Sequence, residues 1–222
     1  METSEVICAV STAPGIGAIA VLRMSGTGCI ALTDRIFESP SGKKLTGSKA
    51  NTVHFGKILE EGCLLDEVLV TIFHAPHSFT GEESVEIACH GSLYIQQRLL
   101  QLLVNQGARM ATPGEFTQRA FLNGKMDLSQ AEAVADLIAS SSAASHRMAL
   151  KQMKGGFSAE LMKLRGELLH ITSLLELELD FSEEDVEFAD RSELRRIAGN
   201  IDELLTRLCR SFSLGNVIKN GV

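Results

Sequence analysis

Three charged residues, Arg23, Glu86 and Lys125, have side chains suited to binding a small polar ligand. A glutamate carboxylate can accept two hydrogen bonds from an aminopyrimidine edge, and Arg or Lys can pair with a carboxylate of the same ligand. Arg23 ends one strand-like run, Glu86 lies within another, and Lys125 follows a glycine in a loop. From the residues alone, ordinary surface ion pairs are the competing interpretation.

The segment PGEFTQRAFLNGKMDLSQAEAVADLI, at 113–138, gathers polar side chains where the pattern changes from mixed α and β to helix. A simple fold has no evident need for them there, and boundaries between domains are favoured places for small-ligand sites. We therefore interpret the segment as a domain boundary and a candidate ligand site. Its polar residues are Glu115, Gln118, Arg119, Asn123, Lys125 and Asp127.

Phosphate-binding motifs are missing from the sequence or poorly matched. Gly15-Ile16-Gly17 stands between two strand-like runs, opens no helix and lacks the GxGxxG spacing of dinucleotide-binding loops. We interpret it as a tight turn or bulge whose glycines also let the backbone approach a ligand. Neither GxxxxGKS nor GxxxxGKT occurs, so these residues contain no P-loop.

The spacing of other reactive residues disfavours metal and nucleophile sites. His74, His77 and His90 lie near Cys89, but no second pair completes a tetrahedral zinc set. Cys89 and His90 are neighbours in a predicted strand, so they face opposite sides and make a weak nucleophile–base pair. The acidic run from Glu176 to Asp190 suits a solvated helix end better than a cation site. We expect no catalytic or metal-binding residue in this chain.

The composition indicates a folded, acidic protein. Hydrophobic residues make up 45% of the 222 residues, and the longest apolar runs are too short for a membrane span. With a formal net charge of −7, any role with nucleic acid needs a local basic patch or a partner. The five cysteines form no CxxC pair, and the first residues do not resemble a signal peptide. We therefore expect a cytoplasmic protein.

An α+β domain is predicted over residues 1–122. The alternation in Ser84–Cys89 places Val85 and Ile87 on one side of a strand and Glu86 on the other. The runs and spacings predict strands at 6–10, 18–22, 52–59, 67–73, 84–89 and near Met110, and helices at 28–37 and 92–106.

An incomplete α-helical bundle is predicted over residues 123–222. Asp127 is a candidate N-cap with Gln130 three residues later, close to a capping box. The apolar faces need a larger bundle than these helices supply, so we expect the natural protein to continue beyond Val222. The helical spacing predicts helices that begin at Leu128 and that cover 143–154, 157–175 and 194–212.

Four segments of the chain match one known family. They are TAPGIGAIAVLRMSG at 12–26, HSFTGEESVEIACHG at 77–91, the whole of 113–138, and LELDFSEEDVEF at 177–188. On these segments, and over essentially all 222 residues, the chain resembles the tRNA-modifying GTPase family called MnmE or TrmE. The resemblance implies a mixed-sheet α+β domain like the folate-binding domain of glycine-cleavage-type aminomethyltransferases, which also forms a homodimer. It implies that Arg23, Glu86 and Lys125 contact a tetrahydrofolate derivative, such as the 5-formyl or 5,10-methylene form.

The same resemblance implies chemistry that lies outside these residues. In that family a Ras-like G domain, which uses GTP, magnesium and potassium, is inserted into the helical domain close to the position of Val222. The whole protein acts with the FAD protein MnmG on tRNA and forms a 5-aminomethyl or 5-carboxymethylaminomethyl group on the wobble uridine. Folate is the expected one-carbon source. This chain departs from some members at Ile16, where they carry Arg.

Two alternatives stay open at this point. The chain can be a stand-alone folate-dependent protein of the aminomethyltransferase type with a helical appendage, or a dimerisation scaffold whose folate pocket is vestigial. A P-loop soon after Val222 separates the GTPase from the stand-alone protein, and a folate titration separates binding from scaffolding.

Overall fold

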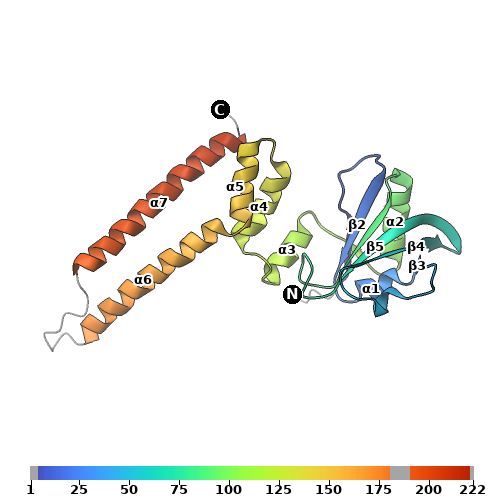
Figure 1. Ribbon diagram of the computed structural model, residues 1–222, viewed down its shortest axis with the longest axis horizontal. Coiled ribbons are helices and arrows are strands. Elements are labelled where there is room, and N and C mark those ends of the chain that lie inside the picture. Colours follow the sequence, from blue (N-terminus) through green and yellow to red (C-terminus); the bar gives the residue numbers. More distant parts are fainter. Residues whose placement is uncertain (1–4, 181–190, 221–222) are drawn as a thin grey trace. The chain divides into compact units, whose positions relative to one another are not determined.

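The computed structural model describes residues 5–180 and 191–220, and the chain divides into two compact units, Met1–Met126 and Asp127–Val222 (Figure 1). The sequence placed the boundary after residue 122. Asn123 and Lys125 stay with the first unit because both donate hydrogen bonds to its backbone, to the carbonyls of Thr80 and Pro76. Within the described ranges, no helix combines the length and the apolar character needed to span a membrane.

The first unit is built on a sheet that has seven strands within the described residues. Their spatial order is β3-β4-β5-β6-β2-β1-β7, and neighbours are antiparallel except for the parallel pair β1 and β7. This mixed sheet, with its helices, confirms the predicted α+β fold class. The strands are β1 (Ile7–Val10), β2 (Ile19–Ser25), β3 (Phe37–Glu38), β4 (Thr52–Glu60), β5 (Cys63–Phe73), β6 (Ser84–His90) and β7 (Arg109–Met110).

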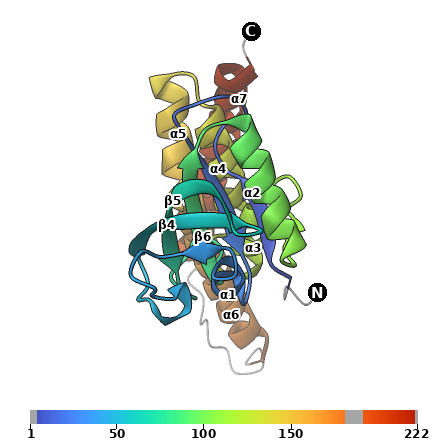
Figure 2. The same ribbon diagram turned by 90° about the vertical axis from the view of Figure 1, so that its right-hand side faces the viewer.

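One face of the sheet is covered by helix and forms the core of the first unit. Helix α2 (Leu93–Asn105) contacts β1, β2, β5 and β6 and lies against the sheet in Figure 2. Leu99 and Leu103 from α2 are fully buried, as are Leu22 of β2 and Ile87 of β6. The unit also contains α1 (Cys29–Thr33), the 3-10 turn η1 (Leu45–Gly47) and α3 (Glu115–Leu122).

The opposite side of the sheet, which we call the open face, carries the alternate residues of the same strands. The register aligns Phe55, Leu69, Ala88 and Val21 in one row across β4, β5, β6 and β2. The next row contains Val53, Thr71, Glu86 and Arg23. As the alternation predicts, Val85 and Ile87 face the core while Glu86 faces this side.

Several predicted elements differ in extent from the structure, and two of them, both in the first unit, have a clear cause. The helix expected at 28–37 ends at Thr33, because Asp34 accepts hydrogen bonds from the backbone N–H groups of Leu45 (2.6 Å) and Thr46 (3.0 Å). The chain then turns and pairs as β3.

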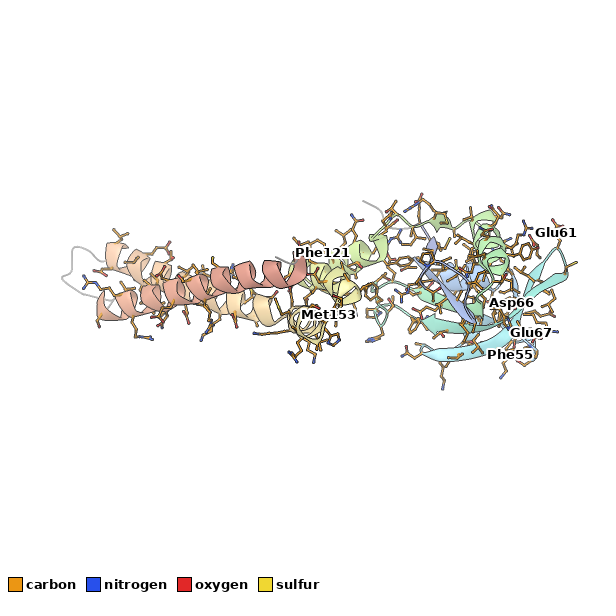
Figure 3. All side chains as sticks on the ribbon, turned by 90° about the horizontal axis from the view of Figure 1, so that it is seen from above. Phe55, Glu61, Asp66, Glu67, Phe121 and Met153 are labelled. Atoms are coloured by element: carbon orange, nitrogen blue, oxygen red, sulfur yellow. The ribbon has the colours of Figure 1, made fainter. Side chains whose placement is uncertain are left out.

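The strand expected at 67–73 begins earlier, at Cys63, and continues the ladder with β4. Glu61 and Gly62 have φ angles of 50° and 82°, and two such residues make a tight hairpin turn that lets both strands run to their ends. Figure 3 shows Glu61 at the tip of this hairpin.

The second unit is helical throughout its described residues. The predicted capping box is confirmed, since Gln130 N donates to Asp127 Oδ1 and Asp127 N donates to Gln130 Oε1, each at 2.9 Å. A hydrogen bond from Ser158 lowers the pKa of Asp127. Helices α4 and α5 pack together, and α6 and α7 lie side by side (Figure 1). The helices are α4 (Leu128–Ala139), α5 (Ala143–Met153), α6 (Gly156–Asp180) and α7 (Arg191–Asn220).

Candidate functional site

Arg23 and Glu86 face each other across two neighbouring strands of the open face. They occupy paired positions on β2 and β6, and the guanidinium donates from Nε (2.9 Å) and Nη2 (2.7 Å) to the same carboxylate oxygen, Oε1. Their side chains are 29% and 30% exposed, so the pair is half-buried and still reachable from solvent. From the residues alone, ion pairing was the competing interpretation, and no partner was assigned to either residue.

Two phenyl rings contact the guanidinium of Arg23. The guanidinium carbon lies 5.3 Å from the centre of the Phe79 ring and 5.8 Å from the centre of the Phe116 ring. Both distances are within cation–π range. Phe79 belongs to the loop between β5 and β6, and Phe116 belongs to α3. Ring contacts of this kind restrict Arg23, and Phe79 remains 38% exposed beside it. Neither ring was among the residues expected at the site, since a lone Phe has no sequence signature of its own.

Lys125 reaches the same loop from the end of α3. Its Nζ donates to the carbonyl of Pro76 at 3.0 Å, three residues before Phe79. The loop also passes close to the lysine at Gly81, where a Cβ would lie 3.2 Å from the Lys125 side chain. The structure therefore brings Arg23 and Glu86 into direct contact and joins Lys125 to them through the loop. Within the described chain, Lys125 makes no hydrogen bond to either residue.

The pair leaves part of its hydrogen-bonding capacity open. Among the described residues, every hydrogen bond to the Glu86 carboxylate goes to Oε1, so Oε2 can still accept. Arg23 uses Nε and Nη2, which leaves Nη1 as a donor, and the Lys125 ammonium has two protons beyond the one given to Pro76. An acceptor beside aromatic rings, with cations nearby, suits a flat ring that carries N–H groups and an acidic tail.

A second set of charged residues binds the same loop, at Glu82. Arg119 is only 4% exposed. Its Nη1 donates to Glu82 Oε2 (3.1 Å) and to the Glu5 carbonyl (3.0 Å), and its Nη2 donates to Glu115 Oε1 (3.2 Å). Glu115 and Arg119 are one helical turn apart on α3, a spacing that pairs opposite charges. These residues were interpreted as polar groups without a structural need, and that interpretation is wrong.

Arg109, whose side chain is 44% exposed, binds Glu115 from the other side. It donates to both oxygens of that carboxylate, at 2.6 and 3.1 Å. This contact, helped by hydrogen bonds from Thr112 and Arg119, holds the pKa of Glu115 at about 2 although burial acts in the opposite direction. Asn123 has a structural partner as well, since its Nδ2 donates to the Thr80 carbonyl at 2.8 Å.

The glycine loop at 14–17 is held by backbone groups. Gly17 N donates to the Gly91 carbonyl (3.1 Å) and Gly91 N donates to the Ala18 carbonyl (3.2 Å). The buried Gln96 adds a bond from Nε2 to the Gly15 carbonyl at 3.3 Å. This geometry agrees with a turn and gives no helix N-terminus for a dinucleotide.

The remaining candidates show structural roles. Cys89 is buried, which raises its pKa to about 11, while His90 faces the other side and binds Asp66 Oδ1 through Nδ1 at 2.7 Å. Asp66 lies on β5 near the hairpin (Figure 3). Over residues 5–180 and 191–220, no three His, Cys, Asp or Glu residues gather as a metal site. The acidic segment 181–190 lies outside the described residues.

Known proteins resemble both units of this chain. A family model described as "GTP-binding protein TrmE N-terminus" matches residues 6–125, and one described as "MnmE helical domain" matches residues 128–222. Curated relatives named tRNA modification GTPase MnmE are 64% identical over 219 residues in Bacteroides fragilis, 61% over 219 in Parabacteroides distasonis and 56% over 222 in Flavobacterium johnsoniae.

These alignments cover 98%, 97% and 100% of the chain and 47%, 48% and 48% of the respective relatives. The chain therefore spans about half the length of the curated relatives it matches. With both units matched by the family's own domains, the chain belongs to the TrmE or MnmE family of GTP-binding proteins.

Proposed function

We propose that this chain is the tetrahydrofolate-binding and dimerisation part of a tRNA-modifying GTPase. The observation that carries the proposal is the Arg23–Glu86 pair on the open face, with Phe79 beside it and Lys125 hydrogen-bonded to the loop that holds Phe79. The names of the relatives support the tRNA-modifying role of the whole protein.

The contacts suit the parts of a folate. Glu86 Oε2 accepts from the N–H groups of the aminopyrimidine ring, and the exposed ring of Phe79 offers an apolar surface to the flat pterin. The two remaining protons of Lys125 pair with the acidic tail. Arg23 holds the Glu86 carboxylate in place and offers Nη1 to a carbonyl oxygen. The bound folate supplies the one-carbon group, as its 5-formyl or 5,10-methylene form.

The activity of the whole protein extends beyond these residues. We place GTP hydrolysis, with its magnesium and potassium, in a G domain that follows this chain. With MnmG, an FAD protein, the assembled enzyme forms the 5-aminomethyl or 5-carboxymethylaminomethyl group on the wobble uridine of tRNA. All five cysteines are free thiols, which fits the cytoplasm as the compartment.

The open face supports the dimerisation role. Val53, Phe55 and Leu69 are large apolar residues that stay exposed on adjoining positions of β4 and β5. Lys57 and Glu67 are paired beside them, so this surface carries both signs of charge. A two-fold interface places the same patch on both subunits and needs such self-complementarity. Figure 3 shows Phe55 and Glu67 on this hairpin.

Titration with tetrahydrofolate tests the binding role. We expect the chain to bind it, and we expect Arg23→Ala and Glu86→Ala each to raise Kd at least about tenfold, the effect of one lost charged hydrogen bond. The matched controls are Arg35→Ala and Glu38→Ala, two exposed residues of the same types that hydrogen-bond neither Arg23 nor Glu86. Unchanged affinity in both site variants rejects the assignment, and a chain that binds no folate is a scaffold.

Sedimentation equilibrium tests the dimer. Phe55→Asp places a charge among the exposed apolar residues Val53, Phe55 and Leu69 and should produce monomers. Leu64→Asp is the control, because Leu64 is an exposed leucine at the tip of the same hairpin. A Phe55→Asp protein that remains dimeric places the interface elsewhere.

A further inference from the structure

The loop from Ser78 to Glu83 is fixed by side chains rather than by strand pairing. Thr80 Oγ1 lies 2.6 Å from Ser25 Oγ, and Ser25 Oγ donates to Glu82 Oε2 at 2.8 Å. Ser78 Oγ donates to the Glu82 carbonyl at 2.6 Å. These contacts fix the loop before and after Phe79, whose ring contacts Arg23.

Arg119 supplies the positive charge that pairs with Glu82 of this loop. Its side chain is 5% exposed and that of Glu82 is 11% exposed, so neither charge has water as a ready substitute for its partner. Removing one member of a buried ion pair leaves the other uncompensated, which is far more costly than losing a surface pair. Loss of Arg119 would therefore leave the Glu82 carboxylate of this loop buried without its charge partner.

The buried set and the candidate site are neighbouring rows of one sheet face. Ser25 lies two residues after Arg23 on β2, and Ser84 lies two residues before Glu86 on β6. Ser25 and Ser84 are paired in register, as are Arg23 and Glu86. A shift of the loop over the serine row must therefore move Phe79 relative to Arg23.

We propose that Arg119 is a positioning residue of the candidate site, which keeps Phe79 over Arg23 by holding Glu82 and the loop against the sheet. Arg119 touches neither Arg23 nor Glu86 among the described contacts, so it acts through the loop. The identity of the ligand rests on the proposed function, whereas the position of the loop does not.

A tryptophan in place of Phe79 reports the loop position without any ligand. The sequence has no Trp, so a Phe79→Trp protein has a single indole, placed beside Arg23. Adding Arg119→Lys shortens the side chain and replaces the guanidinium, which binds two carboxylates, with a single ammonium group. The emission should then shift to longer wavelength as the indole becomes more exposed. Arg109→Lys is the matched control, because Arg109 binds the same Glu115 but does not contact Glu82. Thr80→Val, which removes the bond to Ser25 at nearly constant volume, should produce the same shift.

The same variants, with Phe79 intact, are then titrated with tetrahydrofolate. Arg119→Lys and Thr80→Val should raise Kd about tenfold with unchanged circular dichroism, and Arg109→Lys should not. If Arg119→Lys and Thr80→Val leave the emission unchanged, the positioning role is wrong. That conclusion does not depend on the measured affinity for folate. If the wild-type chain binds no folate while the emission shifts, the proposed function fails and the positioning role stands on the emission.

Discussion

Arg23 donates two hydrogen bonds to a single oxygen of Glu86, and both side chains remain about 30% exposed. An ion pair with this much exposure contributes only about 0.2–1 kcal/mol to folding, because water screens it. The Arg23–Glu86 pair therefore contributes little to the stability of the fold. A substitution there should affect ligand binding much more than it affects the free energy of unfolding.

Phe79→Ala should weaken tetrahydrofolate binding about tenfold, since the pterin loses an aromatic contact and Arg23 loses one of its two rings. Because Phe79 is partly exposed, the loss of stability should stay below about 2 kcal/mol. Isothermal titration and urea unfolding measure the two effects. Phe121→Ala is the control, at 39% exposure against 38% for Phe79. Equal affinity in the two variants would remove Phe79 from the site.

Glu115→Gln should reduce stability at neutral pH by about 2–3 kcal/mol. The pKa of Glu115 in the folded protein is about 2, below its ordinary value of 4.5, because Arg109 and its neighbours favour the carboxylate. A lowered carboxyl pKa stabilises the fold above the unfolded-state value, and this contribution disappears as the pH falls from about 4.5 toward 2.

The difference in unfolding free energy between wild type and Glu115→Gln should therefore shrink over that acidic range. Urea unfolding at several pH values measures it, with the exposed Glu38→Gln as the control. A difference that stays constant down to the lowest pH contradicts the ionic role of Glu115.

Native thiol labelling should modify Cys63 and Cys209 alone. These two are exposed, whereas Cys8, Cys29 and Cys89 are buried. Burial raises the pKa of Cys8 and Cys89 to about 11 and that of Cys29 further, so these thiols stay protonated near neutral pH. Mass spectrometry after brief alkylation should show two labels on the folded chain and five after denaturation. Rapid native labelling of a third thiol would show that the core opens.

Gly91→Ala should destabilise the first unit by about 2 kcal/mol or more, because the new Cβ would collide with the Gly17 carbonyl oxygen. The contact is backbone against backbone, so neither atom can move aside by a side-chain rotation. Gly47→Ala is the control, since no atom lies within 4 Å of a Cβ there. Thermal unfolding of the two variants measures the difference, and equal midpoints would exclude the collision.

Strong local patterns in the sequence predicted the frame of the site. Alternation in Ser84–Cys89 correctly placed Glu86 on one side of β6 and Val85 and Ile87 on the other. The leucine spacing identified α2. Asp127 and Gln130 formed the capping box that their spacing indicated. Each of these features depends on residues within one helix or one strand, which a single sequence records directly.

Contacts between distant segments account for what the sequence did not predict. Asp34 ends α1 by binding backbone groups of η1. No sequence pattern near Asp34 predicts this end of the helix. Arg119 and Glu82 are 37 residues apart and meet only after the sheet has formed. The charge of Arg119 therefore looked surplus in the sequence, although it is buried and paired. The role of Arg23, Glu86 and Lys125 in folate binding stays a prediction that the titrations above decide.

The glycine loop also determines how freely one of its positions can vary. Its shape depends on backbone bonds among Gly17, Ala18 and Gly91 and on the Gln96 amide, while the side chain of Ile16 is 84% exposed and holds nothing in place. Evolution can therefore exchange a neutral residue for a cation at position 16 without refolding the loop. A lineage can tune the local electric field at this edge of the sheet while the scaffold beneath it keeps the same geometry.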